Sequence, residues 1–235
     1  MTEHEMLLLG IADALGSELL EEVAFVGGAT VSLHLDNAQP MDIRSTKDVD
    51  FIVSVTSYGD FQRLATQLKE RGFKEDSQPE DDSISPICRF VCNGVIVDVM
   101  PDEEKILGFS NPWFQTGREQ AIPYTLPGHI TIRVVPAPYL LATKLAAYFS
   151  RGTDILESKD AEDIVILVNG RDALVDEILS GPEDLRDYVR GEMHKFISDS
   201  SFDYLLDSAL NGEEAERYDM IEERFFKLAG RELND

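Results

Sequence analysis

The sequence predicts two parts: a mixed α/β domain at residues 1–136 and an all-helical domain at residues 137–235. In the first part, short apolar runs alternate with segments of helical periodicity, which is typical of a sheet flanked by helices. An Asn93-Gly94 pair between two β-branched runs indicates a tight hairpin, so some strands are antiparallel. Beyond residue 137 the apolar positions recur at helical spacing only. We therefore expect an α/β (α+β) fold with a mixed β-sheet, followed by helices alone.

The elements of the first part can be assigned in order. Apolar residues spaced at three and four predict a helix over residues 6–20, and a second amphipathic helix over 57–71 ends at Gly72. The run Val-Ala-Phe-Val at 23–26 predicts a buried strand. The remaining predictions are a helical segment at 29–35, strands at 50–55, 87–92 and 95–100, one or two strands within 123–135, and an acidic loop at 74–85.

The second part contains predicted helices at 139–151, 158–169, 172–180, 183–197 and 215–229. The most apolar stretch, around 139–149, carries Lys144 in its middle, so we expect no membrane span. The N-terminus MTEHEMLLLG lacks the basic residues of an export signal. Cys88 and Cys92 lie four residues apart along one predicted strand, too far to bond comfortably. These features predict a cytoplasmic protein with reduced cysteines and no membrane partner.

The chain is strongly acidic, with 45 Asp and Glu against 21 Lys and Arg and a formal net charge of −24. Such a chain repels nucleic acid at long range, so a nucleic-acid substrate would need a local basic patch or a partner's help. The same acidity is also explained by solubility or by a salty cytoplasm.

Gly27 and Gly28 end the strand at 23–26 and precede a helical segment. A glycine pair there lets a phosphate chain approach the backbone, and it presents amide N–H groups to the anion. The alternative is that the turn simply requires glycine.

Three aspartates point to phosphoryl chemistry. Asp48 and Asp50 are two residues apart at the start of a strand, so they share one face, and this spacing suits Mg²⁺. Asp98 interrupts a run of β-branched residues, where a charge is costly unless it is paired or binds a metal. If the two strands are neighbours, the three carboxylates converge and can hold two metal ions. The alternative is a solvated acidic turn, with Arg44 either balancing the aspartates or contacting phosphate.

A second polar motif lies in the helical part. Lys144 and Arg151 are two helical turns apart and share one face. Asp160 and Asp163 share a face of the next predicted helix. Opposed faces would form a polar network in which Lys144 reaches a triphosphate. The alternative is an interhelical ion-pair network without a ligand.

These motifs together resemble a known superfamily. Gly-Gly at a strand end, Asp-x-Asp at the next strand and a lone Asp on a later strand resemble the DNA polymerase β-type nucleotidyltransferases. The segment Lys144–Arg151, followed by Ser158-Lys-Asp-Ala-Glu-Asp163, is similar to the Lys…Arg…Lys-Asp-x-x-Asp motif of the AbiEii-type nucleotidyltransferases of type IV toxin–antitoxin pairs. Members of the superfamily often have Gly-Ser where this chain has Gly27-Gly28, which removes one hydroxyl from the turn.

The resemblance implies Mg²⁺-dependent transfer of a nucleoside monophosphate from an NTP to an acceptor hydroxyl on tRNA or another RNA. It also implies a cognate antitoxin protein as a partner. Two Mg²⁺ ions would be held by Asp48, Asp50 and Asp98, with Lys144 as a further catalytic residue. The nucleotide-binding residues under this resemblance are Gly27, Gly28, Arg44, Lys144, Arg151, Asp160 and Asp163.

Other acceptors and another class of function stay open at this point. The net charge of −24 leaves a protein hydroxyl or a cationic small molecule such as an aminoglycoside as alternative acceptors. A non-catalytic nucleotide-binding module is the rival class. The presence of all three aspartates favours an enzyme, because a degenerate copy is expected to lose at least one.

Overall fold

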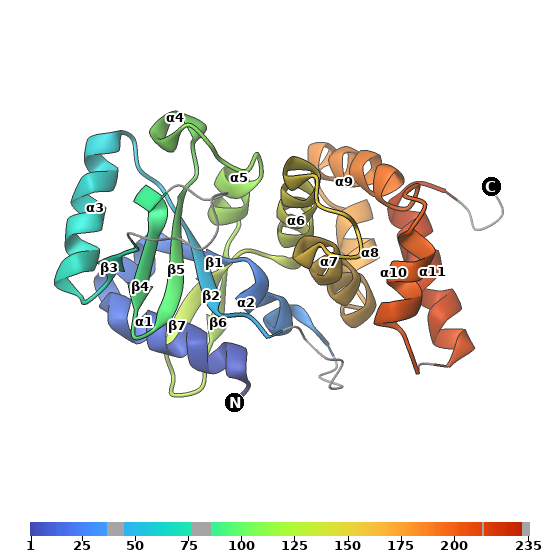
Figure 1. The fold of residues 1–235 in the computed structure, drawn as a ribbon, viewed down its shortest axis with the longest axis horizontal. Coiled ribbons are helices and arrows are strands. Elements are labelled where there is room, and N and C mark those ends of the chain that lie inside the picture. The colour runs from blue at the N-terminus through green and yellow to red at the C-terminus, as the bar shows by residue number, and fades with distance from the viewer. Residues whose placement is uncertain (37–44, 77–85, 213, 232–235) are drawn as a thin grey trace. The chain divides into compact units, whose positions relative to one another are not determined.

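The structure is a computed structural model that describes residues 1–36, 45–76, 86–212 and 214–231. These residues form two compact units, the first made of 1–32 and 45–136 and the second of 33–36 and 137–231. Strands lie in the first unit, and the second consists of helices joined by turns (Figure 1). The predicted fold class, a mixed sheet with flanking helices followed by helices alone, is confirmed.

In the described part of the first unit, seven strands form one mixed sheet in the order β3-β4-β5-β2-β1-β7-β6. Their bounds are β1 (Val23–Val26), β2 (Asp48–Val53), β3 (Lys74–Glu75), β4 (Arg89–Cys92), β5 (Val95–Pro101), β6 (Ile122–Thr125) and β7 (Thr131–Val134). Strand β2 lies at the centre, antiparallel to β1 and parallel to β5. Strand β1 is buried along its whole length, as its apolar sequence predicts.

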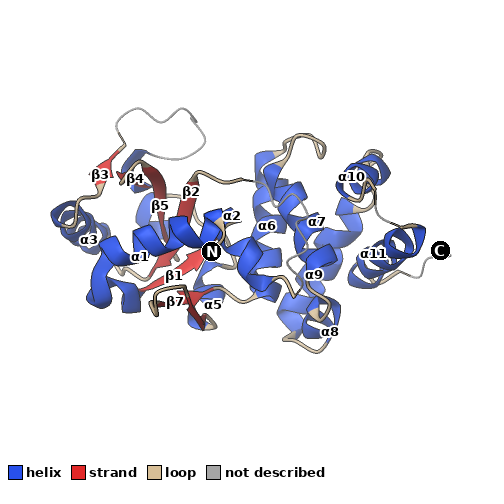
Figure 2. Ribbon diagram, turned by 90° about the horizontal axis from the view of Figure 1, so that it is seen from below, coloured by secondary structure: helices blue, strands red, loops and turns tan. Residues whose placement is uncertain are grey.

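Short helices and one long helix accompany the sheet. They are α1 (Glu3–Glu22), α2 (Gly28–Val31), α3 (Tyr58–Glu70), α4 (Glu104–Leu107) and α5 (Phe114–Glu119), with 3₁₀ turns η1 (Ser32–His34) and η2 (Pro86–Cys88). A capping box starts α1: the Thr2 hydroxyl accepts from the Glu5 amide, and the Glu5 carboxylate accepts from the Thr2 amide. Helix α1 contacts β1, β2 and β7, and Figure 2 shows it running along the sheet.

The predicted bounds of one central strand were wrong. Strand β2 spans 48–53 rather than 50–55, so both aspartates belong to the ladder with β5. Backbone pairing does not depend on the side chain, and an acidic residue can join a strand when its side chain reaches the partly exposed face. The ladder with β1 stops at Val53, which pairs with the first residue of that strand. The short elements β3, α4 and α5 were not predicted, because they are too brief to show a period.

The second unit contains α6 (Ala137–Arg151), α7 (Lys159–Gly170), α8 (Leu174–Leu179), α9 (Glu183–Phe196), α10 (Phe202–Ala209) and α11 (Ala215–Leu228). Of these, α10 was not predicted. An aromatic cluster joins four of the helices: Phe196 lies 5.2 Å from Tyr148, 5.9 Å from Phe202 and 6.2 Å from Phe225, measured between ring centroids. Among the described helices of the whole chain, none combines the length and the apolarity that crossing a bilayer requires.

Candidate functional site

Asp48 and Asp50 lie on one face of β2. The burial pattern along the strand alternates at its start, with both aspartates half-buried and Val49 between them fully buried. This alternation follows from the two-residue period of a strand. Just before the strand, the buried Thr46 donates a hydrogen bond from its hydroxyl to the Asp48 carboxylate. The predicted common face of the two aspartates is therefore present.

Gly27 makes room for the second of these aspartates. Val26, the last residue of β1, is the register partner of Asp50, so the glycine that follows lies beside that side chain. A Cβ built on Gly27 would overlap the Asp50 carboxylate and lie 2.8 Å from its Cγ. The Gly27 backbone has φ 85° and ψ −169°, a combination that is essentially restricted to glycine. Glycine is therefore required here both for the backbone conformation of the turn and for the space that the Asp50 side chain occupies.

Asp98 lies beside Asp50 but is held by an arginine. The two aspartates are register partners in the parallel β2–β5 pair, and Asp98 is the antiparallel partner of Arg89 on β4. The Nε of Arg89 donates to Oδ1 of Asp98 at 2.8 Å, and its Nη2 donates to Oδ2 at 2.9 Å. Asp98 is 1% exposed and Arg89 6% exposed. The pair is thus a buried, bidentate salt bridge, the strongest form of this contact.

The oxygen donors fit one divalent cation better than two. Mg²⁺ is usually held by one or two carboxylates together with water and substrate phosphates, which matches the half-buried Asp48 and Asp50. Both oxygens of Asp98 accept hydrogen bonds from Arg89, so a second ion on this carboxylate would lie against the guanidinium charge. Within residues 1–36, 45–76, 86–212 and 214–231, no group of three or more His, Cys, Asp or Glu side chains is arranged to hold a metal. The three-carboxylate metal set stays a prediction: Asp98 lies beside Asp50, and its carboxylate is paired with Arg89.

The second polar motif forms a buried network inside the helical unit. Lys144 on α6 places its Nζ 3.2 Å from Asp160 and 2.6 Å from Asp163, both on α7. Arg151, two helical turns further along α6, contacts the other oxygen of Asp160 at 2.5 Å. Ser158 caps α7 by accepting a hydrogen bond from the Ala161 amide, which places the two aspartates in the first turns. The structure therefore brings together all four residues that the sequence singled out in this part.

Two predicted site residues remain to be placed. Gly28 is the first residue of α2 and is buried, directly after the Gly27 turn. Arg44 lies outside the described residues.

The partner of Asp98 was not predicted, although the sequence contained the signal. Asn93 and Gly94 both have positive φ, 53° and 81°, as a two-residue hairpin turn requires. Such a turn pairs Cys92 with Val95, and counting outward along both strands pairs Arg89 with Asp98.

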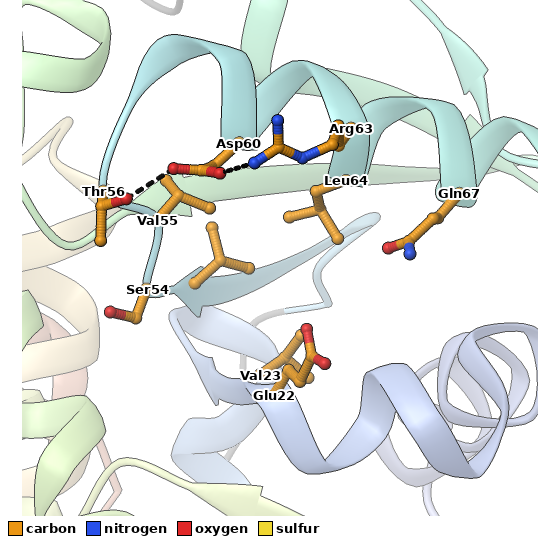
Figure 3. Close-up of a pocket in the computed structure, with 10 residues that line it drawn as sticks. Glu22, Val23, Ser54, Val55, Thr56, Asp60, Arg63, Leu64 and Gln67 are labelled. Atoms are coloured by element: carbon orange, nitrogen blue, oxygen red, sulfur yellow. Dashed lines mark hydrogen bonds and ion pairs between the residues drawn. The ribbon is translucent and has the colours of Figure 1, made fainter.

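A hollow of about 370 Å³ lies elsewhere in the first unit, at the opposite end of β1 and β2 (Figure 3). Val23 and Val53, which line it, are three residues along the strands from the aspartate site, about 10 Å away. Its Asp60 accepts a hydrogen bond from Thr56 and pairs with Arg63, and the hydroxyl bonds lower the Asp60 pKa. The polar groups Thr56, Asp60 and Arg63 therefore already bind one another.

Comparison with known proteins identifies the family of the chain. A family described as "Nucleotidyl transferase AbiEii toxin, Type IV TA system" matches residues 12–231. A solved structure, "Crystal structure of an antigenic nucleotidyltransferase-like protein from Paracoccidioides brasiliensis", is 17% identical with a TM-score of 0.48, and the match covers 82% of this chain and 88% of that chain. No curated protein matches the sequence. The family match extends over nearly the whole chain and confirms the resemblance seen in the motifs. The chain therefore belongs to the AbiEii family of type IV toxin–antitoxin nucleotidyltransferases, and it is a nucleotidyltransferase.

Proposed function

We propose that this nucleotidyltransferase moves a nucleoside monophosphate from a Mg²⁺-bound NTP to a hydroxyl at an RNA end, with release of pyrophosphate. The observation that carries the proposal is the pair of half-buried aspartates on one face of β2, next to the Gly27 turn. Two carboxylates on one strand face beside the partly exposed Gly27 suit a metal-bound triphosphate.

The roles of the residues follow from this arrangement. Asp48 and Asp50 would hold one Mg²⁺, which supplies positive charge that neutralises the phosphates when it is bound. Thr46 orients Asp48 through its hydroxyl, and Gly27 leaves the space that Asp50 occupies. The Gly27–Gly28 backbone amides would position the phosphates, because positioning is most of what phosphoryl-type transfer requires of a protein.

The helical unit contributes the second half of the proposal. Lys144 is 8% exposed and is held between Asp160 and Asp163. We propose that Lys144 binds a phosphate group by exchanging one of these carboxylates for a phosphate oxygen. Arg151 would then stay paired with Asp160.

RNA is the acceptor that we favour, because the family is one of toxins and the resemblance to it implies an RNA acceptor. A second candidate is a protein or a cationic small molecule with a free hydroxyl. The net charge of −24 favours this candidate, since it opposes the approach of a polyanion.

The test is label transfer from each of the four α-³²P-NTPs with Mg²⁺, using total tRNA, a cell lysate and an aminoglycoside as separate acceptors. Asp48→Asn/Asp50→Asn is the inactive variant, and Asp13→Asn, at an exposed position on α1, is the matched control. Label on RNA that is absent only from the double variant would support the proposal. Label on a protein band or on the aminoglycoside would instead support the second candidate acceptor. No transfer to any acceptor would count against both.

A further inference from the structure

The salt bridge between Arg89 and Asp98 occupies the position where the predicted second metal site would be. Asp98 is the direct neighbour of Asp50 across the parallel pair, about 4.8 Å away between strands, so its carboxylate is close enough to share a ligand set. Yet each of its oxygens accepts one hydrogen bond from the same guanidinium. An arginine cannot lose its charge at any relevant pH. A divalent cation on Asp98 would therefore lie against a permanent positive charge.

The local sequence holds this arginine in place. The Asn93-Gly94 turn sets the register of β4 and β5, and a slip by one residue would move every side chain to the opposite face. Arg89 is 6% exposed, so water does not screen its charge from Asp98. The bidentate geometry also engages both carboxylate oxygens at once, so a metal on Asp98 would have to share both of them with the guanidinium.

We infer that Arg89 closes Asp98 to metal, so that the site takes a single divalent cation, held by Asp48 and Asp50. Arg89 is then a positioning residue: it acts through Asp98 and provides a fixed positive charge where a second ion would otherwise lie. This inference rests on the proposed function, because it concerns the metal of the same site.

The test counts bound Mn²⁺ ions by electron paramagnetic resonance, with MnCl₂ alone titrated into the full chain. Many surface carboxylates bind Mn²⁺ weakly, so the count for Asp48→Asn/Asp50→Asn is subtracted as background. Wild type should bind one ion above that background. Arg89→Gln leaves Asp98 charged and free of the guanidinium, so its count should rise to two. Arg89→Gln/Asp98→Asn removes both charges, can keep a hydrogen bond between the two amides, and should return to one.

A count of two or of zero for wild type would overturn the inference, as would a count of one for folded Arg89→Gln or a lost ion in the double variant. Circular dichroism establishes whether each variant is folded. If Arg89→Gln does not fold, wild type and the double variant decide: one ion in both supports the inference, and any other count refutes it. The count is independent of turnover. Failure of label transfer with one bound ion would reject the proposed function alone, and two ions with normal transfer would reject this inference alone.

Discussion

Gly27→Ala tests directly whether the site needs the Asp50 side chain in its present position. The Gly27 backbone lies in a region that is essentially restricted to glycine, and holding an alanine there costs about 1–3 kcal/mol. The new Cβ would also overlap the Asp50 carboxylate and lie 2.8 Å from its Cγ, so that side chain must turn away. Since domains of this kind are stable by about 5–15 kcal/mol, the variant should still fold.

The expected effect on catalysis is larger than the effect on stability. A misplacement of about 1 Å in a catalytic group typically costs about 100-fold in rate, and Asp50 must move at least that far to avoid the new methyl group. Label transfer under the conditions given above should therefore fall by about 100-fold or more. Urea unfolding, followed by circular dichroism, gives the change in stability of the same preparation.

Gly108→Ala is the matched control. Gly108 has φ 82°, close to that of Gly27, but a Cβ built there meets no atom within 4 Å. It should lose about 1 kcal/mol of stability from the positive φ and keep the wild-type transfer rate. If Gly27→Ala transfers label at the rate of this control, Asp50 does not need its present position and the reasoning about the site is refuted.

Three further outcomes are expected. Lys144→Met removes the cation between two buried carboxylates, so it should lower the free energy of unfolding by about 3–5 kcal/mol in urea titrations. Lys159→Met, at an exposed position, should not lower it. Equal losses in the two variants would contradict a buried network. Burial, followed by neighbouring carboxylates, raises the pKa of Glu222, so its charge destabilises the fold above the ordinary Glu pKa and not below it. Thermal melts should show Glu222→Gln more stable than wild type by about 0.5 kcal/mol or less at pH 7, and equally stable at acidic pH. Glu223→Gln is the control and should gain no stability, because the Glu223 carboxylate pairs with a lysine. A gain in stability for Glu222→Gln that persists at acidic pH would refute the charge of Glu222 as its cause. Burial raises the pKa of Cys88 to about 12, so a disulfide reagent at pH 8 should react with it only after unfolding, and rapid reaction of the native protein would contradict its burial.

Much of the site could be predicted because its geometry depends on neighbours in the sequence. The two-residue period of a strand places Asp48 and Asp50 on one face wherever the strand lies in the sheet. The Asn-Gly turn likewise determines that Arg89 faces Asp98, since a two-residue loop leaves one register for the hairpin. In the helical unit, helical spacing alone gives the faces that carry Lys144 and its carboxylate partners.

Other features were decided only by tertiary structure. Strand β5 lies parallel to β2 in the register that joins Asp50 to Asp98, and nothing near either residue specifies that pairing. The same holds for the approach of Gly27 to Asp50 and for the contact of α6 with α7. The physical reason is common to all three. Contacts between distant segments depend on which apolar faces bury one another across the whole unit, whereas periods and turns are determined by a few adjacent residues.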